Sequence, residues 1–267
     1  MQTNPISFLS YKMFEPLGKH TYGFFNYLGG FAKLLFQFFE QVFTPPFYLR
    51  LTIEQIRAIG IQSVPLVAVT AAAIGSVMAL QLAYGFARFG GEIYVPKIVA
   101  LSLVRELGPV FASIMVAGRV GAGIAAEVGS MKVTEQIDAI RALGTSPIRK
   151  IVIPRVLAML IVIPLLACLA DIIGILGGMV ICVFELGFNP TFYINKVIEA
   201  VLMRDFIEGI MKTFFFGGMI AVTGCYLGFN TKGGTQGVGK ATTQSVVISS
   251  IAILVGDFLL TKLFLSL

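Results

Sequence analysis

The chain has 267 residues, of which 57% are hydrophobic and only 13% are charged, and its mean hydropathy is +0.88. This composition excludes an ordinary soluble domain and predicts an integral membrane protein. The net charge is +6, but the basic residues are scattered among hydrophobic segments, so we expect contact with anionic lipid headgroups and no nucleic-acid partner. Three widely spaced cysteines and the single, isolated His20 indicate no disulfide framework, metal site, cofactor or histidine-based catalysis.

Residues 1–60 are predicted to form an N-terminal arm without a cleavable signal sequence. Within this arm, the stretch "YGFFNYLGGFAKLLFQFFEQVF" (residues 22–43) has apolar side chains at helical spacing, namely Tyr27, Phe31, Leu35, Phe38 and Val42. Polar Asn26, Lys33, Gln37 and Gln41 fall on other faces. We expect an amphipathic helix lying in the headgroup region, weakened or bent at Gly29 and Gly30.

Five hydrophobic segments follow, each close to the roughly 20 residues of helix that span a bilayer core. They cover residues 61–87, 107–126, 156–184, 213–229 and 241–264. Pro109 is expected to bend or break the helix that contains the second segment. The sequence therefore predicts an all-α integral membrane protein, in which an interfacial N-terminal helix precedes a transmembrane domain of about five helices over residues 61–267.

The basic residues predict how these segments are oriented. Five crossings place residues 1–60 and the loops near 127–155 and 230–240 on one side, which carries twelve lysines and arginines against seven on the other. Because basic loops stay in the cytoplasm, we expect a cytoplasmic N-terminus and a C-terminus on the outer side of the membrane.

The loop "GSMKVTEQIDAIRALGTSP" has a second amphipathic pattern. It predicts a short helix over about residues 131–143, capped by Ser130, ended at Gly144 and lying parallel to the membrane. Its exposed face would carry Lys132, Glu135, Asp138 and Arg141. These charges of both signs suit a protein partner better than lipid headgroups alone, although a helix that merely covers the end of the bundle is the alternative.

Small residues also follow a helical pattern. In "AGRVGAGIAAEVG", Gly118, Ala122 and Ala126 form one row, and Gly121, Ala125 and Gly129 form a second. Rows of this kind let helices approach closely in lipid, so packing alone explains them.

Charged residues within the apolar segments are informative because each costs at least about 2.5–3.5 kcal/mol at the membrane centre and usually has a partner. Lys212 lies at the same expected depth as Glu106, and it can pair either with Glu106 or with Glu208, one turn earlier on its own helix. Spacing does not separate these alternatives. Asp171 and Asp257 are isolated and need buried partners such as Thr or amide groups, and their pattern does not separate proton coupling from structural anchoring.

The stretch "GTQGVGKAT" (residues 234–242) is one residue short of a phosphate-binding P-loop, because Ala241 stands where Ser or Thr is required. It lies between two membrane segments instead of after a buried strand. We interpret it as a tight turn, with Lys240 as an anchor at the membrane surface.

Three longer stretches resemble the MlaE (YrbE) permease family from about residue 50 to the end. They are "VMALQ" at residues 77–81, "SLVRELGPVFASIMVAGRVGAGIAAEVGSMKVTEQIDA" at 102–139 and "ATTQSVVISSIAILVGDFLLT" at 241–261. The resemblance implies a non-catalytic permease subunit of an ABC-type phospholipid transporter in the bacterial inner membrane. The implied partners are a second copy of the chain, a cytoplasmic ABC ATPase and a periplasmic MCE-domain protein. It leaves open a small cytoplasmic regulatory subunit.

The resemblance also implies roles for particular residues. The helix near 131–143 would be the coupling helix that docks in the ATPase. Glu106 and Lys212 would lie at the polar end of an outward-opening lipid cavity, which favours their mutual pair over the pair with Glu208. The cavity wall would include Met78, Leu82, Phe86 and Phe89.

Two other classes of membrane protein fit the sequence less well. An ion-coupled secondary transporter of a hydrophobic substrate is suggested by Asp171, Asp257 and Glu106, but it would be favoured by inverted repeats, and none is evident. A membrane-bound acyltransferase lacks a catalytic constellation.

Overall fold

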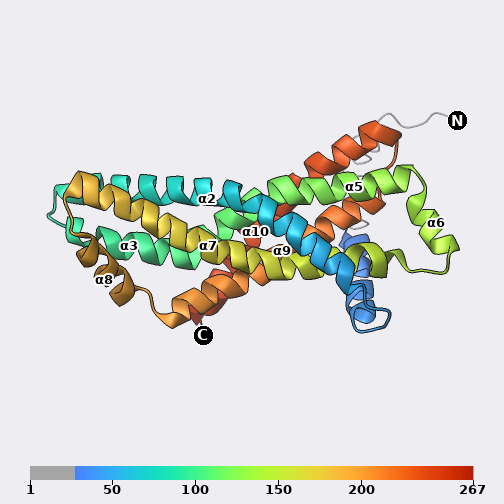
Figure 1. The fold of residues 1–267 in the computed structure, drawn as a ribbon, viewed down its shortest axis with the longest axis horizontal. Coiled ribbons are helices and arrows are strands. Elements are labelled where there is room, and N and C mark those ends of the chain that lie inside the picture. The colour runs from blue at the N-terminus through green and yellow to red at the C-terminus, as the bar shows by residue number, and fades with distance from the viewer. Residues whose placement is uncertain (1–27, 267) are drawn as a thin grey trace, which may run out of the picture.

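The computed structural model describes residues 28–266, and its helices form one elongated bundle (Figure 1). His20, Asn26 and Tyr27 of the predicted arm lie outside these residues. All regular structure in residues 28–266 is helical. Five helical segments are long and apolar enough to cross a membrane: Leu49–Ala87, Glu92–Val133, Ile148–Leu186, Met203–Phe229 and Gly234–Ser266. The predicted all-α integral membrane protein with five transmembrane helices is confirmed.

The membrane helices extend beyond the hydrophobic segments that predict them. Helix α2 (Leu49–Ala87) begins well before residue 61, so the expected boundary between arm and permease domain falls inside a continuous helix. Helices α9 (Met203–Phe229) and α10 (Gly234–Ser266) also begin earlier than expected. Hydrophobicity marks only the part of a helix within the hydrocarbon, whereas backbone hydrogen bonding continues into the headgroup region.

Of the expected bend or break at Pro109, the structure excludes the break. After the short turn η1 (Glu92–Tyr94), the second span runs without interruption through α3 (Val95–Ser102), η2 (Leu103–Leu107), α4 (Gly108–Val116), η3 (Ala117–Gly121) and α5 (Ala122–Val133). Both η2 and η3 are π-helical turns. Pro109 lies in the first turn of α4, directly after η2. The wider turn accommodates the proline ring and its missing N–H within a continuous helix.

The third span begins with the π-helical turn η4 (Ile148–Val152) and continues as α7 (Ile153–Leu186). A short helix that the sequence analysis did not predict, α8 (Pro190–Ala200), follows, and its N-terminus is capped by Asn189, whose side chain accepts a hydrogen bond from the Thr191 N–H at 2.8 Å. Figure 1 places α8 at one end of the bundle and α6 (Gln136–Ala142) at the other. These ends are called the α8 end and the α6 end below.

Small residues allow the helices to pack with their backbones close together. A Cβ atom at Gly75 of α2 would overlap the carbonyl oxygen of Gly174 in α7. Along η3 and α5, the row that contains Gly121 and Gly129 is buried against α9 and α10, whereas Gly118 is exposed. The prediction of close packing is therefore confirmed for one of the two rows.

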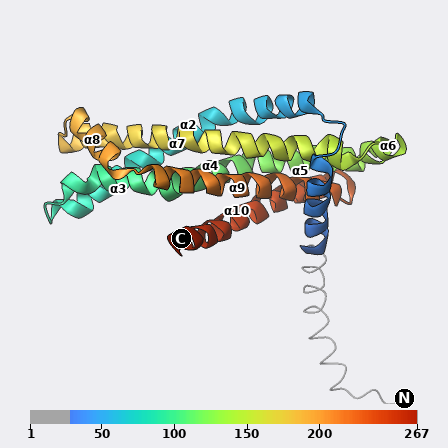
Figure 2. The same ribbon diagram turned by 90° about the horizontal axis from the view of Figure 1, so that it is seen from below.

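The described part of the N-terminal helix, residues 28–42, lies across the bundle (Figure 2). Leu34 and Phe38 are buried in the core, and Phe31, Leu35 and Val42 pack partly against it. The face of this helix that packs on the bundle therefore contains the predicted apolar residues 31, 35, 38 and 42, together with Leu34, which was not predicted. Residues 28–30 are helical, so Gly29 and Gly30 do not interrupt this helix.

Candidate functional site

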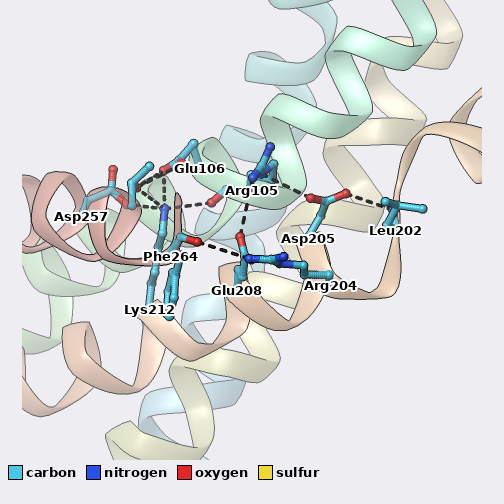
Figure 3. Close-up of polar contacts among 10 residues, drawn as sticks. Arg105, Glu106, Leu202, Arg204, Asp205, Glu208, Lys212, Asp257 and Phe264 are labelled. Atoms are coloured by element: carbon cyan, nitrogen blue, oxygen red, sulfur yellow. Dashed lines mark hydrogen bonds and ion pairs between the residues drawn. The ribbon is translucent and has the colours of Figure 1, made fainter. Parts of the chain in front are cut away.

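A buried lysine in α9 joins three segments of the bundle (Figure 3). The Lys212 side chain is 2% exposed. Its Nζ donates to a carboxylate oxygen of Glu106 in η2, and it lies 3.0 Å from Asp257 Oδ1 and 2.7 Å from Thr261 Oγ1, both in α10. The Arg105 carbonyl oxygen is 3.1 Å away. Lys212 thus pairs with the acid of another helix, and not with Glu208.

The carboxylates of Glu106 and Asp257 supply the negative charge that the buried ammonium group of Lys212 requires. Lys212 has three N–H donors, and the four surrounding acceptors satisfy all of them. Thr261 in turn donates toward Glu106, whose two carboxylate oxygens are each 3.2 Å from the Thr261 hydroxyl. The expectation of a Thr or amide partner for Asp257 is corrected, because its partner is the charged Lys212.

A second ionic network lies beside the first and is centred on Arg105. The Arg105 guanidinium is 3.4 Å from Asp205 Oδ1 and 3.6 Å from Glu208 Oε2. Glu208 also accepts a hydrogen bond from Arg204 at 2.6 Å, and Asp205 caps α9 by accepting from the Leu202 N–H at 3.0 Å. Arg105 and Glu106 are consecutive residues of the turn η2, so one π-helical turn supplies both networks.

A cavity of about 240 Å³ lies between the two networks. Leu101, Phe264 and Leu265 contribute apolar surface, and the polar lining consists of Ser102, Arg105, Glu106, Glu208, Lys212 and Thr261. The Arg105 side chain is 33% exposed and the Glu106 side chain 35%, so both remain accessible to a ligand. A cavity of this size accommodates a polar headgroup, whereas acyl chains would extend beyond it.

The four predicted wall residues do not line this cavity within one chain. Met78, Leu82 and Phe86 are partly buried, and they pack at the α8 end against a cluster that contains Val95, Leu103 and Tyr193. Phe89 is 83% exposed. Their contribution to a lipid cavity stays a prediction.

The structure corrects the bounds of the loop helix. Ser130 is not a cap, because α5 continues through it to Val133, and α6 begins only at Gln136. The corner is made by Glu135, whose φ is +59°. The stop at Gly144 is as expected, with φ of +71°. The early part of the predicted helix is thus the last turn of α5, which packs beside α10 through Gly129 and Val238.

The charged residues of this loop form ion pairs with one another. Asp138 lies 2.9 Å from Lys132 Nζ and 3.0 Å from Arg141 Nη1. The hydrogen bond from Lys132, together with the positive charges of Lys132 and Arg141, holds the pKa of Asp138 below its usual range. Glu135 is exposed, and Leu143 is 81% exposed while Ile137 is buried. The α6 loop therefore has a charged surface next to an unburied leucine.

The other intramembrane charges have different environments. Asp171 in α7 is buried, and within residues 28–266 neither of its carboxyl oxygens has a hydrogen-bond partner, contrary to expectation. It lies directly against Gly108, where a Cβ would overlap its Oδ1. Arg119 of η3 donates to Ser63 Oγ at 2.8 Å and to the Gln62 side chain, both in α2.

Arg105, Asp257 and Thr261 belong to these networks but were not among the predicted site residues, although Arg105 directly precedes Glu106. Asp257 and Thr261 are four residues apart in an apolar segment, so they share one face of α10. This spacing is the feature of the sequence that could have indicated a shared polar site. The P-loop-like stretch is not the tight turn that was expected, because residues 234–242 form the first turns of α10. The turn lies just before it and includes Gly233, whose φ is +84°.

Comparison with known proteins adds a family context. Residues 52–263 match the family described as Permease MlaE. A probable ABC transporter permease protein of Rickettsia felis is 46% identical over 93% of this chain and 96% of its own length. A probable ABC transporter permease protein of Synechocystis is 40% identical over 80% of this chain and 81% of its own. The intermembrane phospholipid transport system permease protein MlaE of Haemophilus influenzae is 32% identical over 92% of this chain and 95% of its own.

Proposed function

This chain belongs to the MlaE permease family, and from that premise we propose that it is the membrane-spanning subunit of an ATP-driven phospholipid transporter in the bacterial inner membrane. The observation that carries the proposal is the cavity beside Lys212, where charged side chains are concentrated at one level of an apolar bundle. Ionisable groups within a membrane domain are costly and usually mark a substrate path. A phospholipid needs this combination of a polar site for its headgroup and apolar surface for its chains.

In this proposal Arg105 and Lys212 attract the headgroup phosphate, while Glu106 holds Lys212 in place. Arg105 is the more accessible cation, because Lys212 is surrounded by its own acceptors. The chain acts as a homodimer, and the outward-opening lipid cavity lies between the two copies. Met78, Leu82, Phe86 and Phe89 contribute its apolar wall.

The α6 loop is the proposed contact with a separate ABC ATPase. Its charged surface, Lys132, Glu135, Asp138 and Arg141, has the mixed charges that fit a protein groove, and exposed Leu143 adds an apolar contact. The α6 end and the N-terminus are then cytoplasmic, and the C-terminus is periplasmic. A periplasmic MCE-domain protein exchanges phospholipid at the α8 end, and a small regulatory subunit would bind on the ATPase side.

The test is reconstitution of the chain with its ATPase and MCE-domain partners in liposomes. ATP-dependent transfer of a labelled phospholipid is measured together with crosslinking from a photoreactive residue at Ser102, which lines the cavity. We expect Glu106→Gln and Leu101→Trp to reduce both signals at least about tenfold, and Arg50→Gln, an exposed arginine of α2 outside the cavity, to change neither. Unchanged crosslinking and transfer in both cavity variants would refute the site.

The unpaired carboxyl of Asp171 favours one alternative, an ion-coupled transporter of a hydrophobic substrate. The two mechanisms differ in their source of energy. Transport that persists in liposomes without any ATPase, is driven by a proton gradient and stops in Asp171→Asn would replace the ATP-driven proposal.

A further inference from the structure

A second cavity, of about 550 Å³, lies at the α6 end of the bundle. It is formed by the N-terminal helix (residues 28–42), the connection between α6 and η4, and the end of α9, and it shares no lining residue with the cavity beside Lys212. Among the described residues that line it, the polar ones are Lys33, Gln37, Gln41, Arg141, Ser146, Tyr226 and Asn230. No acidic side chain belongs to the described lining.

The N-terminal helix directs a polar stripe into this cavity. Positions 30, 33, 34, 37 and 41 all line it, and their spacing of three or four residues puts them on one side of the helix. Leu34 and Phe38 are buried and hold the helix against the bundle, so Lys33 and Gln37 face the cavity by helical geometry. Gln41 joins the two walls, because its Oε1 accepts a hydrogen bond from Ser146 at 2.7 Å.

The local charge balance is positive. Asp138 is shared between Arg141, at 3.0 Å, and Lys132, at 2.9 Å, so one carboxylate faces two cations. Lys33 forms no ion pair with any residue between 28 and 266. The cavity therefore has a net excess of positive charge with hydrogen-bonding groups on its walls, which is the chemistry that binds a phosphate group.

The N-terminal helix also marks the depth of this cavity. A separate cavity of about 240 Å³ is lined only by apolar residues, including Leu35 and Phe39 of this helix, Leu160 of α7, and Phe215 and Met219 of α9. Along α9, these apolar residues lie nearer the middle of the helix than Phe229 and Asn230, which line the polar cavity. The helix thus separates an apolar side from a polar side, as an interfacial helix does at the boundary between acyl chains and headgroups.

We propose that the polar cavity binds the phosphate-bearing headgroup of an anionic phospholipid from the membrane leaflet at the α6 end. Lys33 and Arg141 bind the phosphate oxygens, while Gln37 and Asn230 hydrogen-bond the rest of the headgroup. The bound lipid links the N-terminal helix to the α6 connection. The proposal does not depend on ATP-driven transport, because it concerns a bound lipid at the end of the bundle opposite to α8.

The test uses the purified full chain in phosphatidylcholine nanodiscs containing a minor fraction of phosphatidylglycerol, without ATPase. A photoreactive residue replaces Gln41, and mass spectrometry identifies the crosslinked lipid. We expect phosphatidylglycerol to be enriched over its share of the nanodisc. The double variant Lys33→Gln with Arg141→Gln should lower its crosslinking about tenfold, since it removes two charge-assisted contacts.

The matched control is Lys232→Gln with Lys240→Gln, which removes two exposed positive charges at the same end but outside the cavity. We expect less than a twofold decrease in this variant. If the double cavity variant does not fold, Lys33→Gln alone changes only an exposed side chain and should lower crosslinking about threefold.

Three results would overturn the proposal. An equal decrease in the cavity variant and the control would show bulk attraction to the membrane surface. No enrichment of phosphatidylglycerol over phosphatidylcholine would show that the phosphate charge is not recognised. Displacement of the crosslink by millimolar inorganic phosphate in the aqueous phase would assign the cavity to a soluble phosphate compound. Loss of transport in the earlier liposome assay bears on none of these, because the present readout uses the permease alone.

Discussion

Replacing Lys212 by Met tests whether the buried network holds α9 against η2 and α10. The substitution keeps an unbranched side chain but leaves Glu106 and Asp257 without their shared cation. Removing one partner of a buried ion pair costs about 3–5 kcal/mol. Because the Glu106 side chain is 35% exposed and that of Asp257 20% exposed, water relieves part of the repulsion, and we expect a value at the lower end, about 3 kcal/mol. For a chain of this length, that corresponds to a decrease of roughly 6–12 °C in the unfolding temperature.

The unfolding of detergent-solubilised protein can be followed with a thiol-reactive fluorophore, because Cys182 and Cys225 are buried and become reactive when the bundle opens. The control is Lys196→Met, which also removes a lysine–carboxylate pair of 2.7 Å, with Glu199, but at the protein surface, where ion pairs contribute little. Little change is expected there.

A triple variant separates the charge effect from a packing effect. Lys212→Met combined with Glu106→Gln and Asp257→Asn removes the unpaired acids together with the cation, and we expect it to recover at least half of the lost stability. The reasoning would be refuted if Lys212→Met were as mild as Lys196→Met, or if the triple variant were no more stable than Lys212→Met alone.

Two further predictions concern the packing of α2 and the α6 loop. Gly75→Ala should destabilise the bundle by about 1–3 kcal/mol, since its Cβ would overlap the Gly174 carbonyl of α7. The control is Gly85→Ala in the same helix, whose Cβ meets open space. Thermal unfolding of both variants checks this prediction, and equal decreases in unfolding temperature would contradict it. The lowered pKa of Asp138 means that its hydrogen bond from Lys132 is present at neutral pH and is lost as the pH falls through that lowered value. A spin label at Ala139 should therefore keep its mobility from pH 7 down through the ordinary Asp pKa of about 3.9 and become more mobile only at lower pH. Asp138→Asn should be mobile throughout, and a wild-type loop that loosens near pH 6 would exclude this pair as the cause.

The sequence predicts best those features of the fold that depend on neighbouring residues alone. The five membrane segments follow from runs of apolar residues, and their order is confirmed. The bounds were less accurate, because a helix does not end where its hydrophobicity ends. Ser130 illustrates this: its hydroxyl suits a cap, but α5 passes through it and turns only at Glu135. Pro109 likewise suggested a break that a π-helical turn avoids.

The sequence by itself determined that this protein crosses the membrane with five helices and carries costly charges at a few depths, since the cost of burying a group in lipid depends mainly on that group. The tertiary structure alone decided which charges meet. Lys212 has an acid on its own helix and another 106 residues away, and only the packing of η2, α9 and α10 brings Glu106, Asp257 and Thr261 around it. The same holds for Asp171, because no local pattern indicates that this buried acid lies against Gly108 with no hydrogen-bond partner among residues 28–266. Such contacts depend on the rotation and depth of each helix relative to its neighbours, and these are set by the close packing of small residues over the whole bundle.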